Sequence, residues 1–477
     1  MQPQAGQHRQ LRELLHDRLR GRASPLVIGR GFAVPAATLW AGARAWVHAF
    51  RAAGLAPGDR VVLGIERSPA HIMVTIACWW EGLMLCPIAP ATDAGQALVE
   101  FDARLAVANQ LGACTPDAGG GPPAKLGVLR EAAEPTPDIA MLLTTSGTSG
   151  HAKRVALSWM NLVAQLSSHT AMLGDERAER AMSVLPWHHA FGLLVDLWPR
   201  LLSGTTIYVD EGDGRDVASI AHQLAKHNIT HVSMVPRQAS LLLACQVSEH
   251  MHHKLGGVVG GAPVSAALAE SLARTRLRAG YGLTEASPGV TLGEPGEWHA
   301  GWLGRPLGCE VRIVDGELHV RGPNVAAGYW RGRRGTPGRF IEADSDRWLA
   351  TQDLVETIDG AAPKHGLRFI GRADTRFKLD NGRMIDTPAM EAALSAAFPE
   401  LEPIVFTGGG RHLTIAMIGQ GACATEASVA QILGSSARLV DAVVAVADDG
   451  RLRTAKGTIR RDAVRQQVTR SHAALAA

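Results

Sequence analysis

Apolar and polar positions follow alternating helical and extended spacings through the first part of the chain. Apolar residues recur every three or four positions over 36–53 and 70–85, which predicts helices, and PGDRVVLGI at 57–65 predicts a turn and a short strand between them. The alternation of helices and strands continues along the chain through residue 288. We expect helices at 159–171, 217–227 and 266–274, and strands within 181–186, 230–236, 255–263 and 277–288. This alternation predicts an α/β fold of layered sheets and helices.

The pattern changes near Val311. VRIVDGELHVRG contains two alternating runs around Asp315-Gly316, a strong hairpin signal, and short strands follow within 347–357 and 367–374. The last hundred or so residues predict a small α+β unit with a strand pair near 377–385, a helix over 389–397 and strands at 403–407 and 412–418. At 477 residues the chain is too long for one core, so we expect at least two domains.

Composition excludes several classes of protein. With 46% hydrophobic and 19% charged residues the chain is typical of globular proteins, and a net charge of +3 gives no nucleic-acid footprint. The six cysteines form no C-x-x-C pair, which argues against a zinc site or a disulfide framework and fits a reducing cytoplasm. Residues 1–22 lack an apolar signal core, so a surface helix is favoured over a targeting peptide, and no apolar run reaches membrane-spanning length.

Residues 144–158, TTSGTSGHAKRVALS, carry the first chemical signal: a glycine-rich segment between two predicted strands, IAMLL at 139–143 and VALS at 155–158. Small residues let a backbone approach a ligand closely, while hydroxyls and N–H groups surround phosphate oxygens and Lys153 adds a positive charge. The alternative is a plain Ser/Gly linker. The GK[ST] of a Walker loop is absent at the needed spacing, which argues against a kinase or an ordinary NTPase.

Four further stretches follow in order: YGLTE at 281–285, ELHVRGPNVAAGYW at 317–330, TQDLVE at 351–356 and GRADTRFKLDNGRMID at 371–386. With TSGTSGHAK they resemble the signatures of the adenylate-forming superfamily, which includes acyl- and aryl-CoA synthetases and peptide-synthetase adenylation domains. The resemblance covers roughly 39–465. It implies a large N-terminal AMP-binding domain at 1–373 and a small mobile α+β domain at 374–477 that swings about a hinge at Asp374.

The resemblance also implies the chemistry. A small carboxylic acid and MgATP would give an acyl-adenylate and pyrophosphate, and the thiol of CoA or of a carrier-protein phosphopantetheine would then displace AMP. The implied residues fall into groups by ligand. The β- and γ-phosphates would be bound by Thr145, Ser146, Gly147, Thr148, Ser149, Gly150 and Lys153, the α-phosphate by Thr284 and Mg²⁺ by Glu285. Adenine would be bound by Gly260, Gly261, Ala262, Tyr281 and Gly282, and ribose by Asp353 and Arg372. His189 would contact the acyl group, and the thioester step would use Lys378, Gly382 and Arg383.

Several of these assignments have a plainer alternative. Glu285 suits Mg²⁺ because hard cations prefer carboxylate oxygen, but it could be a solvated loop residue. The Gly260-Gly261 pair could be a simple tight turn, and Asn381-Gly382 a surface hairpin turn. A lone histidine such as His189 is usually a packed or surface residue.

Three positions depart from the family pattern: Ala152 replaces a usual proline, Gln352 a usual glycine, and Thr458 the lysine that bridges the carboxylate and the α-phosphate during adenylation. Three accounts of Thr458 are open. Lys456 could replace the lysine, because a two-residue offset keeps the same face of an extended chain. The first half-reaction could be slow or use other positive charge. The enzyme could also have drifted to β-lactone closure or another adenylate reaction, and a non-catalytic ATP-binding regulatory protein is a different class.

The acid itself is not specified by the sequence, although the lack of a long insertion favours a small one. CoA and an acyl carrier protein are both candidate acceptors. The basic C-terminal segment could contact CoA phosphates or an acidic carrier helix, or could be a solvated face.

Overall fold

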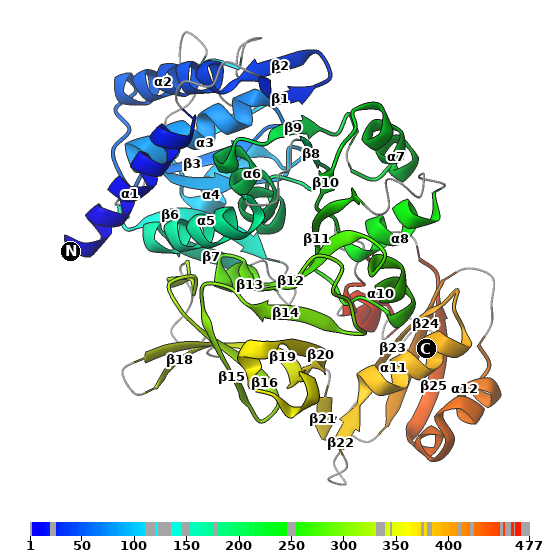
Figure 1. Cartoon of the computed structure of the whole chain (residues 1–477). Coiled ribbons are helices and arrows are strands. Elements are labelled where there is room, and N and C mark those ends of the chain that lie inside the picture. The colour runs from blue at the N-terminus through cyan, green and yellow to red at the C-terminus, as the bar shows by residue number, and fades with distance from the viewer. Residues whose placement is uncertain are drawn as a thin grey trace.

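The structure is a computed structural model (Figure 1). It describes residues 2–19, 25–109, 120–122, 135–145, 153–174, 180–212, 214–245, 254–330, 339–343, 346–373, 376–378, 384–407, 412–419, 424–448, 452–453, 459–461 and 463–468.

A first sheet contains six strands among the described residues, in the order β17-β7-β6-β4-β3-β5. The strands β3 to β6 are parallel, and β6, β7 and β17 continue antiparallel. Their bounds are β3 Arg60–Gly64, β4 Met84–Pro87, β5 Leu105–Ala108, β6 Ile139–Thr145, β7 Lys153–Ser158 and β17 Gly328–Tyr329. Because β6 and β7 pair antiparallel, with Thr145 opposite Lys153, the two ends of the glycine-rich segment lie side by side.

Both faces of this sheet are buried. In β6, Met141 and Leu143 join the core formed with helices α1 to α3, α5 and α6, whereas Leu142 joins a second core with α4. This alternation is the period of two expected for a strand. The covering helices are α1 Gln2–Leu19, α2 Ala36–Ala52, α3 Pro69–Glu81, α4 Ala94–Phe101, α5 Trp159–Gly174 and α6 Trp198–Ser203, and a π-helical turn η1 spans Phe191–Leu197 (Figure 1).

A second sheet contains fourteen strands within the described ranges, and β1, β9, β8, β10, β11 and β12 are parallel neighbours in that order. Its strands are β1 Pro25–Gly29, β2 Phe32–Pro35, β8 Arg180–Ser183, β9 Thr206–Val209, β10 His231–Val232, β11 Gly256–Gly260, β12 Arg276–Gly282, β13 Gly289–Leu292, β14 Trp302–Pro306, β15 Glu310–Val314, β16 Glu317–Arg321, β18 Phe340–Ala343, β19 Asp346–Thr357 and β20 Leu367–Arg372. The helices α7 Val217–Lys226, α8 Pro236–Ala244 and α10 Ala266–Leu272 connect its parallel strands. The carboxyl ends of β8, β10, β11 and β12 therefore meet at one edge.

The predicted hairpin near Val311 is confirmed. β15 and β16 pair antiparallel, and Asp315 and Gly316 between them have φ angles of 51° and 81°. Two left-handed residues at a two-residue turn match the right-handed twist of the flanking strands.

The C-terminal part has its own cores. Two clusters on opposite faces of the sheet β23-β24-β25 contain only residues from Ile385 onward, and Leu394 of α11 lies fully buried in one of them. The elements are β21 Arg376–Lys378, β22 Met384–Asp386, α11 Thr387–Ala397, β23 Glu402–Thr407, β24 Leu413–Ile418, α12 Glu426–Leu433 and β25 Val440–Val446. The α/β class, with a large layered part and a smaller α+β part, is confirmed, and Figure 1 shows the smaller part in orange beside the sheets. The boundary at 373/374 and the mobility of the smaller part stay predictions.

One predicted element was wrong at its end. The helix predicted over 70–85 ends at Glu81, where Gly82 adopts a left-handed cap with a φ of 72°. Met84–Pro87 then forms β4, parallel to β3. No described helix is both long and apolar enough to cross a membrane.

Candidate active site

The stretch 317–330 joins the glycine-rich segment (144–158) to the YGLTE stretch (281–285). Thr145 at the end of β6 lies opposite Lys153 at the start of β7, and β7 pairs with β17 through Val155 and Tyr329. The Nζ of Lys153 lies 5.1 Å from the centroid of the Tyr329 ring. This pairing holds the predicted phosphate lysine next to a tyrosine that also contacts Glu285.

Glu285 is a buried carboxylate with two described partners. It lies on a single 3₁₀ turn, η2 (Thr284–Ala286), directly after β12, and only 5% of it is exposed. Tyr329 donates its hydroxyl proton to Oε1 at 2.8 Å, and Arg339 donates from Nη1 to the same oxygen at 3.2 Å. Burial, followed by the charge of Glu285, raises the pKa of Tyr329, so this hydroxyl remains a donor at neutral pH. The alternative that Glu285 is a solvated loop residue is therefore wrong.

The predicted ribose residues lie together with Tyr281. The Tyr281 hydroxyl donates to Asp353 Oδ2 at 2.6 Å, and Arg372 donates from Nη1 to Asp353 Oδ1 at 2.8 Å. Burial raises the pKa of Asp353, while the charge of Arg372 and the Tyr281 hydrogen bond oppose that shift. A carboxylate has about four lone-pair positions, so Asp353 can accept further hydroxyl donors while keeping both contacts.

The glycines at this edge are required by their surroundings. A side chain on Gly260 would place its Cβ 2.2 Å from the carbonyl oxygen of Gly280, and one on Gly282 would place it 1.9 Å from that of Pro288. Gly261 has a φ of 83°, which glycine adopts without strain. These constraints explain the glycines through packing and backbone conformation; their contact with adenine, and that of Ala262, stays a prediction.

His189 lies beyond β8 in a group of histidines. The His188 and His189 rings have centroids 4.3 Å apart, and the ring of Trp187 packs against that of His71 from α3 at 5.3 Å. Burial lowers the pKa of His188 to about 4, and burial followed by the nearby His188 lowers that of His71 to about 3, so both rings are neutral at pH 7. Phe191 lies beside Gly261, since a Cβ there would be 3.8 Å from its ring. The contact of His189 with an acyl group stays a prediction.

A buried acid lies behind these histidines. Trp187 donates its indole proton to Ser183 Oγ at 2.9 Å, and Ser183 donates to Asp196 Oδ2 at 3.1 Å. Burial raises the pKa of Asp196 to about 6, against hydrogen bonds and nearby arginines that lower it.

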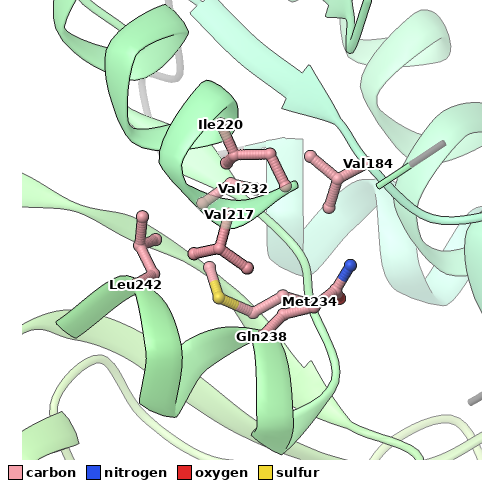
Figure 2. Close-up of a pocket in the computed structure, with 7 residues that line it drawn as sticks. All are labelled: Val184, Val217, Ile220, Val232, Met234, Gln238 and Leu242. Carbon is pink, nitrogen blue, oxygen red and sulfur yellow. The ribbon is translucent and has the colours of Figure 1, made fainter. Parts of the chain in front are cut away.

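The cavity drawn in Figure 2 is lined by none of these residues. Side chains of α7, α8, β8 and β10 and their adjoining residues line it, and its volume is about 10 Å³. That is about one water molecule, and six of its seven lining residues are apolar, so it is a packing defect and not a substrate pocket. The lining residues are Val184, Val217, Ile220, Val232, Met234, Gln238 and Leu242.

Several predicted residues lie outside the described residues: Ser146, Gly147, Thr148, Ser149, Gly150, Asp374, Gly382, Arg383 and Lys456. Lys378 ends β21, whose pairing with β22 agrees with the predicted strand pair.

Sequence reasoning missed three residues of the site: Tyr329, Arg339 and Gln352. Tyr329 lies in the family-like stretch 317–330, which could have indicated it. Gln352 was noted only as a departure, and nothing local in the sequence marks Arg339, which reaches Glu285 from 54 positions along the chain.

The donors around Glu285 suit an Mg²⁺ ion that takes most of its ligands from nucleotide phosphates and water. No group of three or more His, Cys, Asp or Glu side chains suited to a metal occurs in the described part of the chain. Mg²⁺ in nucleotide sites usually takes one or two carboxylates and completes its shell with phosphates and water, so one buried carboxylate beside a phosphate-binding segment is compatible with it.

Comparisons with known proteins agree with the site. The AMP-binding enzyme family matches residues 25–330, more than half of the chain. The protein therefore belongs to the AMP-binding enzyme family and, with it, to the adenylate-forming superfamily.

Similar proteins differ in size and in name. The chain is 30% identical to the phenyloxazoline synthase MbtB of Mycobacterium sp. (strain MCS) over 394 residues, covering 72% of this chain and 32% of that protein. It is 31% identical to a long-chain-fatty-acid–CoA ligase of Escherichia coli O157:H7 over 242 residues, covering 46% and 42%. Each match thus spans less than half of these two relatives. The crystal structure of ATP-bound MatB from Rhodopseudomonas palustris has the same fold, with a TM-score of 0.78, 22% identity and coverage of 96% of this chain and 98% of that one.

Proposed function

We propose that the protein activates a small carboxylic acid with MgATP as an acyl-adenylate and then transfers the acyl group to a thiol. The observation that carries the proposal is one continuous set of contacts. It runs from Lys153 through Tyr329 to Glu285, and from Arg339 through Gln352 and Arg372 to Asp353. Signatures far apart in the sequence thereby meet at one place, as a nucleotide that spans phosphate and ribose sites requires.

The proposed reaction has two steps. In the first, a carboxylate oxygen attacks the α-phosphorus of ATP, and the bond between that phosphorus and the departing pyrophosphate breaks. In the second, a thiolate attacks the acyl carbon, and the bond to AMP breaks. The first step moves negative charge from a carboxylate oxygen to pyrophosphate, and the second moves it from a thiolate sulfur to AMP, so positioning and fixed positive charge supply most of the catalysis.

The predicted phosphate, ribose, metal and acyl residues each have a defined part in this proposal. Lys153 and the hydroxyl-rich segment hold the terminal phosphates, Thr284 contacts the α-phosphate, and Asp353 accepts the ribose hydroxyls with Arg372 beside it. Glu285 holds Mg²⁺, which would neutralise phosphate charge when bound. His189, with Trp187 and Phe191 near it, forms part of the acyl site.

The experiment that tests the proposal is ATP–pyrophosphate exchange with a panel of small aryl and aliphatic acids. We expect exchange with at least one acid. Either CoA or a phosphopantetheinylated carrier protein is then added, and mass spectrometry of the product identifies the acceptor. A protein that binds ATP but exchanges pyrophosphate with none of the acids would contradict the proposal and favour a regulatory relative.

Thr458 is the specific observation that favours a second candidate, a divergent member with altered adenylate chemistry such as β-lactone closure from a β-hydroxy acid. We infer instead that Lys456 supplies the missing charge. Lys456→Ala should lower exchange by about 100-fold, as removal of one transition-state donor commonly does. It should leave thioester formation from preformed acyl-adenylate intact, and Arg465→Ala, at an exposed position, is the matched control. Full exchange by Lys456→Ala would exclude this role. A lactone or other product in the mass spectrum would support the divergent candidate. A cytoplasmic location remains a prediction.

A further inference from the structure

Gln352 has a backbone conformation that is unusual for its residue type. It lies within β19 with a φ of 61°, in the left-handed region, where a residue with a Cβ is strained. Its backbone N–H donates to Glu317 Oε1 at 2.7 Å. A glycine would meet both requirements without strain, so the side chain of Gln352 calls for a separate explanation.

That side chain lies between two arginines. Its amide oxygen accepts a hydrogen bond from Arg339 Nη2 at 2.8 Å and a longer one from Arg372 Nη2 at 3.5 Å. Each arginine uses its other terminal nitrogen on a carboxylate: Arg339 on Glu285 at 3.2 Å and Arg372 on Asp353 at 2.8 Å. One neutral oxygen thus connects the two carboxylates assigned to opposite ends of the nucleotide.

An oxygen at this position stabilises an arrangement that is otherwise unfavourable. Two guanidinium groups directed at one point repel each other, and a shared acceptor offsets that repulsion. The guanidinium geometry is planar and fixed, so an acceptor on one nitrogen also orients the other. Arg339 acts at both ends, because its charge opposes the burial that raises the pKa of Asp353 while it is paired with Glu285.

We propose that Gln352 is a positioning residue that couples the Mg²⁺ end of the site to its ribose end, by holding Arg339 against Glu285 and Arg372 against Asp353. The inference rests on the proposed function, since it assumes that a nucleotide binds at these carboxylates. If the two ends are coupled, occupation of one changes affinity at the other by the same factor in both directions.

Gln352→Gly separates this role from a purely structural one. Glycine keeps the left-handed backbone and the N–H bond to Glu317 but removes the amide oxygen. If Gln352 only shapes the strand, the variant should melt at the same temperature or higher and bind nucleotide normally. If it couples the two ends, the variant should be stable but bind nucleotide more weakly.

Two more variants sharpen the comparison. Gln352→Asn tolerates the left-handed conformation, but its carbonyl is one methylene short of the arginines, so it should behave like Gln352→Gly. Gln352→Glu keeps an acceptor at the same reach and should retain coupling. Glu356→Gln, on the same strand but in an exposed ion pair with Arg368, is the control.

The measurement is titration calorimetry of the full chain with AMP, with ATP and EDTA, and with MgATP, together with a melting curve. We expect Gln352→Gly and Gln352→Asn to bind AMP about 5-fold or more weakly and to reduce the factor by which Mg²⁺ raises ATP affinity, within the range of typical coupling energies. Their melting temperatures should not fall, and Gln352→Glu should bind like the wild type.

Equal affinities and an equal Mg²⁺ effect in Gln352→Gly would overturn the coupling and leave the proposed function intact. Unchanged affinity per folded molecule in both Gln352→Gly and Gln352→Asn, whatever their melting temperatures, would show a purely structural role and also overturn it. A wild-type protein that binds neither AMP nor ATP would overturn the proposed function and the coupling together.

Discussion

Two regions of the candidate site differ in how their ionisable side chains are partnered: the carboxylates Glu285 and Asp353, and the histidines beyond β8 with Asp196. Around Glu285 and Asp353, each buried carboxylate has an arginine and a tyrosine hydroxyl as partners. Beyond β8, His71 and His188 carry pKa values lowered by burial to about 3 and about 4. Asp196 behind them has its pKa raised to about 6.

The difference shows that position at the edge of a parallel sheet does not decide whether a group is charged. Glu285 follows β12 and the paired histidines follow β8, two strands of the same parallel set. Burial raises the pKa of Asp353 as it does that of Asp196, yet Glu285 and Asp353 each accept a hydrogen bond from a guanidinium, whereas Asp196 accepts one from Ser183 and has arginines as nearby charges. A site for phosphates and a metal needs fixed charge, whereas neutral rings suit the uncharged body of an organic acid. The predictions below test this contrast.

Removing the charge of Glu285 should have the largest effect. Glu285→Gln keeps the shape and an oxygen for Tyr329, but loses the charge that pairs with Arg339 and is proposed to hold Mg²⁺. We expect pyrophosphate exchange to fall by about 100-fold or more, the range seen when one transition-state charge stabiliser is lost. Exchange measured across a Mg²⁺ titration checks this, with Glu356→Gln as the control; a variant with full activity at low Mg²⁺ would contradict the charged character of this end.

Asp353→Asn should weaken nucleotide binding by a smaller factor. The amide keeps one oxygen for Tyr281, but the ion pair with Arg372 is lost. Hydrogen bonds to charged groups contribute about 1.5–3 kcal/mol, so we expect AMP affinity to fall by about 10- to 100-fold. Calorimetry with AMP gives the result directly, and unchanged affinity would remove Asp353 from the ribose site.

Asp196→Asn should stabilise the protein above pH 6. Because the folded pKa of about 6 lies above the unfolded value near 3.8, the folded protein binds the extra proton in that window and loses stability as pH rises through it. The ionised acid therefore destabilises the fold at pH 8 by up to about 3 kcal/mol, and we expect the neutral amide to recover about 1–2 kcal/mol of that. Denaturant unfolding at pH 5 and pH 8 measures it. Asp441→Asn, at an exposed position, should show no such pH dependence. A variant that is equally or less stable at pH 8 would mean that Asp196 has a better partner than its burial suggests.

His71→Phe should change the opposite limb of the pH profile by the smallest amount. A folded pKa of about 3 against the reference value of 6.5 means that the unfolded chain binds more protons, so stability is lost as pH falls below 6.5. Between pH 6.5 and 5.5 the wild type should lose about 1 kcal/mol more than the variant, from this group alone. Unfolding measured at both pH values tests it, with exposed His365→Asn as the comparison. Parallel profiles for wild type and variant would place a charged His71 in the folded state.

Much of the fold could be predicted because its elements carry strong periods or strong turn signals. The helix over 159–171 and the Asp315-Gly316 hairpin were identified in this way. The error at β4 has a physical cause: residues 70–85 are apolar almost throughout, so no change of period marks the end of the helix at Gly82. Only the left-handed cap shows where the helix ends.

The site was predictable to the extent that its residues lie in recognisable stretches. Glu285 and Asp353 were indicated by signatures, and the structure places each with a tyrosine and an arginine. Arg339 was not indicated, because its importance comes from a contact with Glu285 across 54 positions. Gln352 shows the same limit: its identity was visible in the sequence, but its two arginine partners depend on the folded path of β19.

The pairing of Thr145 with Lys153 has a consequence for how a nucleotide would be captured. Closing a loop costs conformational entropy that grows with its length, and a binding segment that must also bring its ends together loses affinity by that amount. Here the antiparallel ladder, reinforced by β17, already holds both ends in register in the folded chain. The entropy of bringing Thr145 and Lys153 together is thus lost during folding, and ATP binding would not have to supply it.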